Sequence, residues 1–488
     1  MGTDFDVLII GAGLTGIGTA CQLADAFPHK RVAILERRAR VGGTWDLFRY
    51  PGIRSDSDMY SLGYQFRPWN EAKVLADGPS IRNYIEATAR EYGIDRKIQF
   101  GLKTTKADWC SRARRWTVTA LHEASGETRS YTARFLVSAT GYFNHDEGFR
   151  PRFPGEERFQ GRTIHPQHWP EDLDYTGKKV VVIGSGATAV TLVPTMAAKA
   201  AHVTMLQRSP SYLFSVPAND RLTEVLARIL PPRWAFALAR KRHVFIQRWL
   251  YRVCRRCPML TRRLLLAQVR KQVGPGVDMR HFTPKYLPWD ERLCAVLNAD
   301  LLHAVRDGKA SIETDEIETF TETGVRLKSG KELDANIIVT ATGLKLQMLG
   351  GMELCVDGAP RPLNRQMIYK GVLVENLPNL AWIFGYTNAS WTLKSDLAGG
   401  YINRVLKHMD DHGYDVAVPL DQDNCALPQG MLDSLQSGYV QRDKDTMPRQ
   451  GRKLPWRVLM HYERDRRMLL KDPVDDGLLR FESTLAAS

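Results

Sequence analysis

Three glycines near the N-terminus have the spacing of a site that binds a dinucleotide phosphate. The run Gly11-Ala-Gly13-Leu-Thr-Gly16 follows a short apolar segment, and Glu36 ends the next apolar segment. Such glycines let the backbone approach a pyrophosphate, and the helix that follows stabilises its negative charge. Because Glu36 can accept hydrogen bonds from ribose hydroxyls and would repel a 2′-phosphate, the pattern predicts a site for FAD or NAD. The alternative is a glycine-rich turn without a ligand.

A second glycine-rich pattern lies in the middle of the chain and has the form GxGxxA. It follows the apolar run 179–183, and the next apolar run ends in Gln207-Arg208, where an NAD site would have an acidic residue. An arginine at that place favours the 2′-phosphate of NADPH through charge-assisted hydrogen bonds, although it could also be an ordinary surface charge. We call each glycine-rich turn, together with the start of the helix that follows it, a cradle. The predicted contacts of the second cradle with its cofactor are Ile183, Gly184, Ser185, Gly186, Ala187, Thr188, Ala189, Gln207 and Arg208.

Each glycine-rich pattern must be positioned by a unit of strand, helix and strand. Apolar runs at 5–10 and 31–35 flank the first helical pattern, and runs at 179–183 and 202–206 flank the second. The sequence therefore predicts an α/β fold with two Rossmann-like dinucleotide-binding domains, one for FAD and one for NADPH, and a helical insertion. The expected bounds are 1–147 with 341–488 for the FAD-binding domain, 148–220 with 282–340 for the NADPH-binding domain, and 221–281 for the insertion.

Two further apolar runs, 135–139 and 337–341, each end in the tripeptide Ala-Thr-Gly, which occupies residues 139–141 and 341–343. We interpret these repeats as two matching crossovers between the domains.

The composition is that of an ordinary folded protein. The 488 residues are 43% hydrophobic and 25% charged, and the seven cysteines are scattered, which is typical of a reduced intracellular protein. The N-terminal apolar run is too short for a signal peptide, and no window reaches the roughly 20 apolar residues that cross a bilayer. We expect a cytoplasmic protein. No metal site is predicted, because Cys254 and Cys257 have CxxC spacing without a second ligand pair.

The net charge of +14 is concentrated in one segment. Residues 221–271 contain fourteen Lys or Arg and a single acidic residue, Glu224, with Trp, Phe, Leu and Ile at helical spacing between the cations. Two hypotheses follow: a solvated helical subdomain whose apolar face caps a substrate pocket, which we favour, or peripheral contact with anionic lipid at the inner face of the cell membrane. Nucleic acid is not an expected partner, because no nucleic-acid-binding motif accompanies the cations.

Two longer motifs narrow the function. Residues 159–170 fit FxGxxxHxxxWP, and residues 42–56 fit GGxWxxxxYPGxxxD. Both resemble signatures of the type I Baeyer–Villiger monooxygenases, and the resemblance covers essentially the whole chain. It implies an enzyme that uses FAD, NADPH and O2, and forms a C4a-peroxyflavin that converts a ketone to an ester. Sulfoxidation of thioethers or thioamides is implied as a side activity.

The resemblance also implies roles for individual residues. Arg292 matches the cation that the family places over the flavin, and Asp56 matches its orienting partner, which we expect to be buried and paired. Arg54 and Ser55 are expected along the nicotinamide, and His165 and Trp169 are expected to be structural. Glu291 stands where many relatives have lysine, which weakens the expected selectivity for NADPH. Further FAD contacts implied by the family pattern are Thr15, Thr44, Trp45, Asp46, Leu47 and, through its backbone to the adenine, Thr104. A helical pattern follows Asn388-Ala-Ser-Trp391, and we expect the N-terminus of that helix to face the electron-rich edge of the flavin.

Alternative functions remain open at this stage. A flavin monooxygenase that oxygenates amines or sulfur shares the two cofactor sites, and a non-catalytic, membrane-associated flavoprotein would use the basic helices as its working surface. A disulfide reductase would need a redox-active cysteine pair beside the flavin, and Cys21 and Cys110 do not have that spacing.

Overall fold

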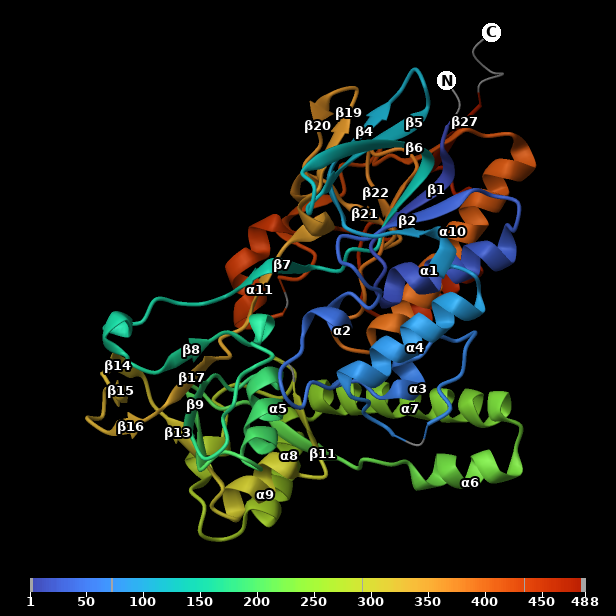
Figure 1. Cartoon of the computed structure of the whole chain (residues 1–488). Helices are drawn as coiled ribbons and strands as arrows, with labels where there is room; N and C mark the ends of the chain where they lie inside the picture. The colour runs from blue at the N-terminus through green and yellow to red at the C-terminus, as the bar shows by residue number, and fades with distance from the viewer. Residues whose placement is uncertain (1–2, 72, 292, 434, 484–488) are drawn as a thin grey trace.

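The chain forms two lobes, with a pair of helices extending to one side (Figure 1). The computed structural model describes residues 3–71, 73–291, 293–433 and 435–483. Both termini lie on the first lobe, and the second lobe is built from the middle of the chain (Figure 1). No helix in these described ranges combines the length and apolarity needed to cross a membrane.

The first lobe is built around one large mixed sheet. Its parallel part has the order β3-β2-β1-β6-β23, and β5 and β4 extend antiparallel from β6. Residues Val7–Ile10 of β1 and all of β2 are buried, as expected for parallel strands that are covered on both faces. The elements of this lobe are β1 (Phe5–Ile10), α1 (Leu14–Ala26), β2 (Val32–Leu35), α2 (Thr44–Leu47), α3 (Met59–Leu62), α4 (Gly78–Glu91), β3 (Ile98–Gln99), β4 (Leu102–Cys110), β5 (Arg115–His122), β6 (Glu127–Ser138), β19 (Glu353–Val356), β20 (Ala359–Pro360), β21 (Ile368–Tyr369), β22 (Leu373–Val374), β23 (Leu380–Trp382), α10 (Trp391–His412), β24 (Val416–Pro419), β25 (Ala426–Gly430), α11 (Gly438–Asp443), β26 (Arg449–Gly451), α12 (Tyr462–Leu470) and β27 (Leu479–Glu482).

The second lobe has a smaller sheet whose strands are all parallel. Its order is β13-β10-β9-β17-β8, and α5 connects β9 to β10 as the second predicted strand–helix–strand unit. The elements of this lobe are β8 (Arg162–Ile164), β9 (Lys179–Ile183), α5 (Ala187–Met196), β10 (His202–Gln207), β11 (Leu213–Val216), β12 (Cys294–Leu297), α9 (Asp300–Arg306), β13 (Ala310–Thr314), β14 (Ile317–Phe320), β15 (Gly324–Leu327), β16 (Glu332–Asp334) and β17 (Ile337–Thr340).

Two adjacent segments carry the chain between the lobes. They are β7 (Phe143–Gly148) and β18 (Leu344–Leu346), which pair antiparallel directly after the two Ala-Thr-Gly repeats. Each repeat also packs against a glycine cradle. A Cβ on Gly11 would lie 2.8 Å from the carbonyl oxygen of Ala139, and one on Gly184 would lie 2.3 Å from that of Ala341. Both glycines also have positive φ values, so the two cradles share one backbone arrangement.

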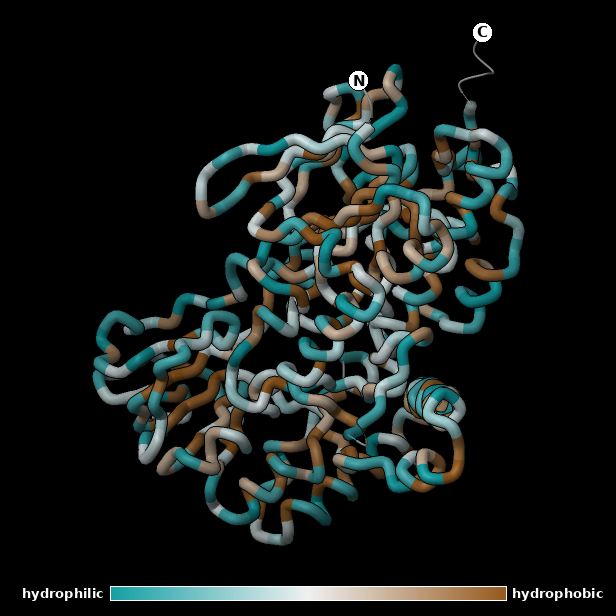
Figure 2. Tube along the Cα trace, turned by 45° about the vertical axis from the view of Figure 1, so that its right-hand side comes forward, coloured by the Kyte–Doolittle hydropathy of each residue, from teal (hydrophilic) through white to brown (hydrophobic). Residues whose placement is uncertain are grey.

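The insertion consists of three helices, α6 (Arg221–Ile229), α7 (Pro232–Arg256) and α8 (Pro258–Val273). The helix α7 is fixed to the first lobe through the buried guanidinium of Arg240. This group donates to the carbonyl oxygens of Tyr60 (3.0 Å) and Gly63 (2.6 Å), and its Nη2 pairs with Asp396 of α10 at 2.7 Å. In the rotated view of Figure 2, brown hydrophobic stretches alternate with teal hydrophilic ones along the helical segments at the lower right.

The predicted fold class, α/β with two Rossmann-like units and a helical insertion, is confirmed. The helices of the insertion end at Val273, and the remaining residues to 281 lead back into the second lobe. We propose that the two lobes correspond to the domains expected at 1–147 with 341–488 and at 148–220 with 282–340.

Candidate active site

A cavity of about 990 Å³ lies where the two lobes and the insertion meet. Gly13 and Thr15 of the first cradle line the cavity, and Thr188 of α5 lines it from the second cradle. Leu222 and Ile246 come from the insertion, so its helices form part of the wall, as the pocket-capping hypothesis expects. Apolar and aromatic side chains dominate the lining, with a few charged groups between them, which is typical of a small-molecule site.

The first cradle has the shape needed to hold a pyrophosphate. The strand β1 ends at Ile10 and α1 begins at Leu14, and no side chain within the described residues caps its N-terminal N–H groups at Gly13. A Cβ on Gly16 would lie 1.8 Å from the carbonyl oxygen of Gly11, so Gly16 permits the tight turn while Gly11 and Gly13 line the cavity. The residues present therefore fit a dinucleotide phosphate at this helix end.

Glu36 is a buried carboxylate on the wall of the same cavity. Its oxygens accept hydrogen bonds from the backbone N–H groups of Ala12 (2.6 Å) and Arg38 (2.8 Å). Burial raises the pKa of Glu36, and these two N–H groups oppose that change. Each oxygen can accept a further bond, so the carboxylate can hold the turn and a ribose hydroxyl together.

Some residues of the motif at 42–56 line the cavity, and others are buried in the protein interior. Thr44 and Trp45 line the cavity, whereas Asp46 is buried beneath it, 2.7 Å from the guanidinium of Arg38. Leu47 belongs to a hydrophobic cluster of the second lobe. Asp46 and Leu47 were expected as FAD contacts, and the structure places them behind the cavity wall.

Thr104 lies on β4 at the cavity wall, as expected for a residue near the adenine. Its Oγ1 is buried and has no hydrogen-bond partner among the described residues. A buried, unpaired hydroxyl costs free energy, so a bound ligand that supplies a partner fits this position.

The second cradle contributes less to the cavity than its sequence suggested. Ala187 and Thr188 line the cavity; the other predicted contacts, which are Ile183, Gly184, Ser185, Gly186, Ala189, Gln207 and Arg208, lie outside it. The cradle opens toward solvent, because Gly186 and Arg208 are exposed. The amide of Gln207 already donates to the carbonyl oxygen of His281 (2.7 Å) and to Thr314 Oγ1 (2.9 Å).

Arg54 and Ser55 line the cavity and also have partners within the protein. Arg54 pairs with Asp300 of α9 at 2.6 Å, which ties the first lobe to the second. Ser55 Oγ donates to the carbonyl oxygen of Ser57 at 2.8 Å.

Asp56 lines the cavity and is exposed, so the expectation that it is buried is wrong. Its expected partner, Arg292, lies outside the described residues, and their pairing stays a prediction. The buried carboxylate of this segment is Asp58, two positions further on. His243 lies between Asp58, at 3.5 Å, and Asp220, at 3.0 Å. All three side chains line the cavity, and no sequence motif predicts this contact between distant segments.

Arg292 lies outside the described residues. Its neighbours Trp289 and Leu293 line the cavity. Glu291 is half-buried; burial raises its pKa, and the charge of Arg208 acts in the opposite direction. Glu291 and Arg208 are therefore close enough to interact, at the place where a 2′-phosphate is expected.

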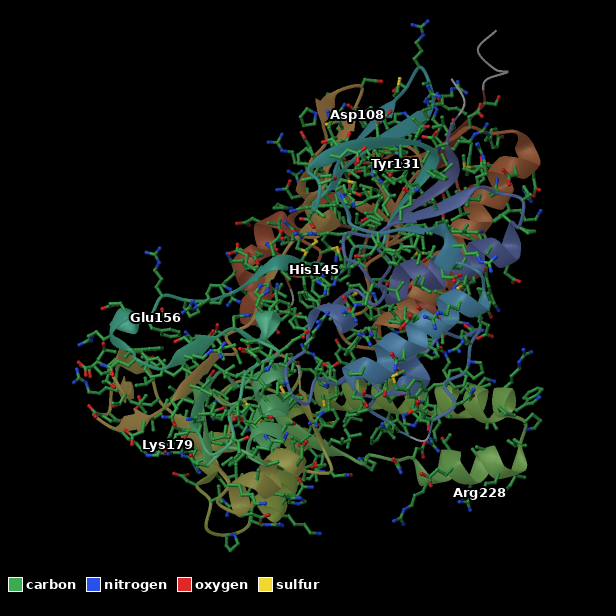
Figure 3. The ribbon with its side chains drawn as sticks, in the orientation of Figure 1. Asp108, Tyr131, His145, Glu156, Lys179 and Arg228 are labelled. Carbon is green, nitrogen blue, oxygen red and sulfur yellow. The ribbon has the colours of Figure 1, made fainter. Side chains whose placement is uncertain are left out.

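Sequence reasoning also missed His145, which lines the cavity. His145 lies on β7 between the two lobes (Figure 3), and its pKa is lowered to about 4 by burial and by the charges of Arg38 and Arg37. It is therefore neutral at pH 7. Trp391, the first residue of α10, donates its indole N–H to Thr15 Oγ1 at 2.8 Å and stacks on Tyr142. The helical pattern after Asn388 did predict that the N-terminus of this helix faces the site.

His165 occupies the structural position that was expected for it. Its Nε2 lies 3.3 Å from the carbonyl oxygen of Gly343, at the crossover between the lobes.

Comparisons with known proteins agree with this geometry. The family described as flavin-binding monooxygenase-like matches residues 74–411, and an NAD(P)-binding Rossmann-like domain matches residues 9–67. This chain belongs to the flavin-binding monooxygenase-like family. The enzyme is thus a flavin-dependent monooxygenase.

Two curated relatives cover almost the whole monooxygenase. MymA of Mycobacterium tuberculosis, named as an FAD-containing monooxygenase, is 65% identical over 99% of this chain and 98% of its own. EthA of the same species, also named as an FAD-containing monooxygenase, is 49% identical over 98% of this chain and 97% of its own. Segments 46–60, 165–175 and 385–394 resemble EthA, and that resemblance is confirmed; MymA is the more similar of these two relatives.

A solved structure supports the same fold. A steroid monooxygenase, described as bound to NADP, superimposes with a TM-score of 0.71 at 25% identity, covering 86% of this monooxygenase and 88% of the other chain.

Proposed function

We propose that this monooxygenase uses FAD, NADPH and O2 to convert a ketone into an ester, with thioethers and thioamides as further substrates. The observation that carries the proposal is a single, largely apolar cavity lined both by the first cradle and by α5 of the second. Two nucleotides held at such a junction can exchange a hydride while the protein supplies their orientation. The FAD in the names of MymA and EthA, and the NADP bound to the steroid monooxygenase, support the same cofactors.

FAD would occupy the first cradle. The free helix end at Gly13 would bind its pyrophosphate, Glu36 its ribose, and Thr104 the adenine side. Thr15, held by Trp391, and the N-terminus of α10 would face the ring system. A helix N-terminus stabilises negative charge nearby, which suits a reduced flavin.

NADPH would occupy the second cradle, with Arg208 on the 2′-phosphate. Arg54, which is tied to Asp300, would fix the nicotinamide half between the lobes. The charge of Arg208 acts on the carboxyl group of Glu291 and is partly offset by it, so discrimination against NADH would be weaker than an arginine alone would provide.

When bound and reduced, the flavin supplies the activated oxygen. The chain would contribute a fixed positive charge at Arg292, oriented by Asp56, where negative charge develops on the substrate oxygen. The apolar walls, including Trp45 and Tyr142, would exclude the water that otherwise diverts activated oxygen into peroxide.

The test is to supply the purified protein with FAD, NADPH, O2 and a panel of aryl and long-chain ketones, thioethers and tertiary amines. We expect esters from the ketones, detected by mass spectrometry. Oxygenation of the amines or thioethers with no ester from any ketone would contradict the proposal and assign the enzyme to the sulfur- and amine-oxygenating branch. NADPH oxidation with no oxygenated product would contradict both.

A further inference from the structure

The helices α6 and α7 form a hairpin, residues 221–256, whose outer face is unusually apolar. Eight of the fifteen large hydrophobic side chains that are exposed in the described residues belong to this hairpin. They are Leu222, Val225, Ile229, Trp234, Leu238, Phe245, Ile246 and Trp249. Ile229 and Trp234 flank the turn of the hairpin and are 73% and 68% exposed, the highest values among these fifteen. Exposed apolar surface of this extent marks an interaction site.

The spacing of these residues in α7 places them on one face. Trp234, Leu238, Phe245 and Trp249 are separated by four, seven and four residues, so they form a single stripe along the helix. Phe236, Ala239 and Val244 lie on the opposite side and are buried. One apolar face of α7 therefore packs into the protein core, and a second apolar face is exposed to solvent.

The same outer stripe is cationic. The hairpin contains ten Lys or Arg and one acidic residue. Carboxylates outside the hairpin pair with Arg240, Arg242, Arg248 and Arg255. The other six cations, which are Arg221, Arg228, Arg233, Lys241, Arg252 and Arg256, form no ion pair within the part of the chain that the structure describes. Figure 3 shows Arg228 on α6, directed away from both lobes.

We propose that this hairpin docks on an anionic lipid surface and that the cavity takes its substrate from that lipid. Tryptophan, phenylalanine and leucine interleaved with Lys and Arg on one exposed helix face are the chemistry that partitions into a headgroup region of negative charge. A second copy of the chain is a poor occupant, because, among the described residues, a symmetric contact would bring the six cations without ion pairs on one hairpin toward the six on the other.

The cavity opens beside this surface. Leu222 and Ile246 line the cavity and are nevertheless 53% and 47% exposed, so the opening lies along the hairpin. An apolar substrate dissolved in the bilayer would pass from lipid into the apolar cavity without crossing water. The substrate class that fits this route is a long-chain, water-insoluble ketone, and this second part of the inference rests on the proposed function.

The first experiment measures sedimentation of the holoenzyme with phosphatidylcholine vesicles, with and without phosphatidylglycerol, at low and high salt. We expect binding that requires phosphatidylglycerol and is weakened by salt. Each lost cation should weaken binding by about fivefold, which corresponds to about 1 kcal/mol. Accordingly, Arg228→Gln, Lys241→Gln and Arg252→Gln together should nearly abolish binding. Arg112→Gln with Lys309→Gln, which removes two exposed cations elsewhere, should have little effect.

The apolar part is tested separately with Ile229→Ser and Trp234→Ser, which lie outside the cavity lining. These variants should lose at least about fivefold in vesicle binding while they keep the unfolding temperature of the parent. Absence of binding to anionic vesicles at low salt would overturn the docking proposal. Unchanged vesicle binding by the serine variants would also overturn the proposal, because it would assign the hairpin to polyanion binding. Self-association of the protein that blocks vesicle binding would overturn it as well.

The second experiment compares a long-chain ketone carried in the same vesicles with a short, water-soluble ketone. We expect the hairpin variants to lose at least about fivefold in turnover of the vesicle-borne ketone and to keep turnover of the short one. Equal turnover of both ketones by the variants would overturn the delivery route. Vesicle binding with no oxidation of either ketone would contradict the proposed function and leave the docking supported.

Discussion

Asp56 and Asp58 stand two positions apart, yet only Asp58 is buried. Ser61 donates to Asp58 from its backbone N–H (2.9 Å) and its hydroxyl (2.8 Å), and His243 lies beside the same carboxylate. Burial acts to raise the pKa of Asp58, but His243 and Ser61 outweigh it and lower the pKa. Asp58 therefore contributes stability above its ordinary pKa, and that stability is lost as the pH falls through the lowered value. Asp56 lines the same cavity, is exposed and does not share these partners of Asp58.

Arg292→Ala tests the cation that the family pattern implies. The variant should still bind FAD and let NADPH reduce it, but ester formation should fall by about 10²- to 10³-fold with a matching rise in peroxide, because nothing replaces the fixed charge. Product analysis and a peroxide assay measure both yields. Arg306→Ala, which removes a half-exposed arginine paired to Asp307, is the control and should behave as the parent. Normal ester yield from the Arg292 variant would remove that residue from the mechanism.

Glu291→Lys tests the cofactor preference. Replacing this carboxylate, which feels the charge of Arg208, with a cation should raise the selectivity for NADPH over NADH by about tenfold, because two positive charges would then act on the 2′-phosphate. The ratio of kcat/KM for the two cofactors is the measurement. Glu332→Lys, an equal charge change at an exposed position on β16, should leave that ratio unchanged. A ratio that rises equally in both variants would indicate a general charge effect.

At the scale of elements, the sequence predicted the features that are formed by residues close together in the chain. Both cradles were found because glycines, the preceding strand and the following helix are contiguous, and the crossovers were found because the Ala-Thr-Gly repeats end strands. Contacts that depend on folding were not found. The association of Asp58 with His243, and the burial of Asp46 behind the wall, need segments that lie far apart or side-chain directions that a motif does not encode.

Arg240→Ala tests how α7 is held. Removing this cation leaves Asp396 buried and unpaired, so the free energy of unfolding should fall by about 3–5 kcal/mol, measured by denaturant titration. Burial already raises the pKa of Asp396 to about 6, with Arg240 opposing, and the variant should raise it further. The deficit should therefore shrink as the pH falls and Asp396 becomes protonated.

The control for this experiment is Arg252→Ala on the same helix. Arg252 is exposed, and its loss should change stability by no more than about 0.5 kcal/mol. Arg240→Met combined with Asp396→Leu should recover most of the loss, because the uncompensated charge is gone. A small, pH-independent effect of Arg240→Ala would mean that α7 is held mainly by its apolar face.

At the scale of the whole molecule, the two lobes and the hairpin converge on one cavity. Both crossovers, β7 and β18, pass beside it, and Arg54 with Asp300 links its two sides. Aromatic and aliphatic walls from all three parts enclose the place where the cofactors would meet. This arrangement supports the proposed function, in which apolar walls would limit the access of water to the reacting oxygen.

The most direct test of this account is the fate of molecular oxygen. The NADPH-reduced holoenzyme is mixed with a ketone and O2 enriched in ¹⁸O, and the product is analysed by mass spectrometry. The account predicts an ester that carries one labelled atom as its bridging oxygen, with the carbonyl oxygen unlabelled. Unlabelled ester, or consumption of O2 that yields peroxide and unchanged ketone, would contradict it.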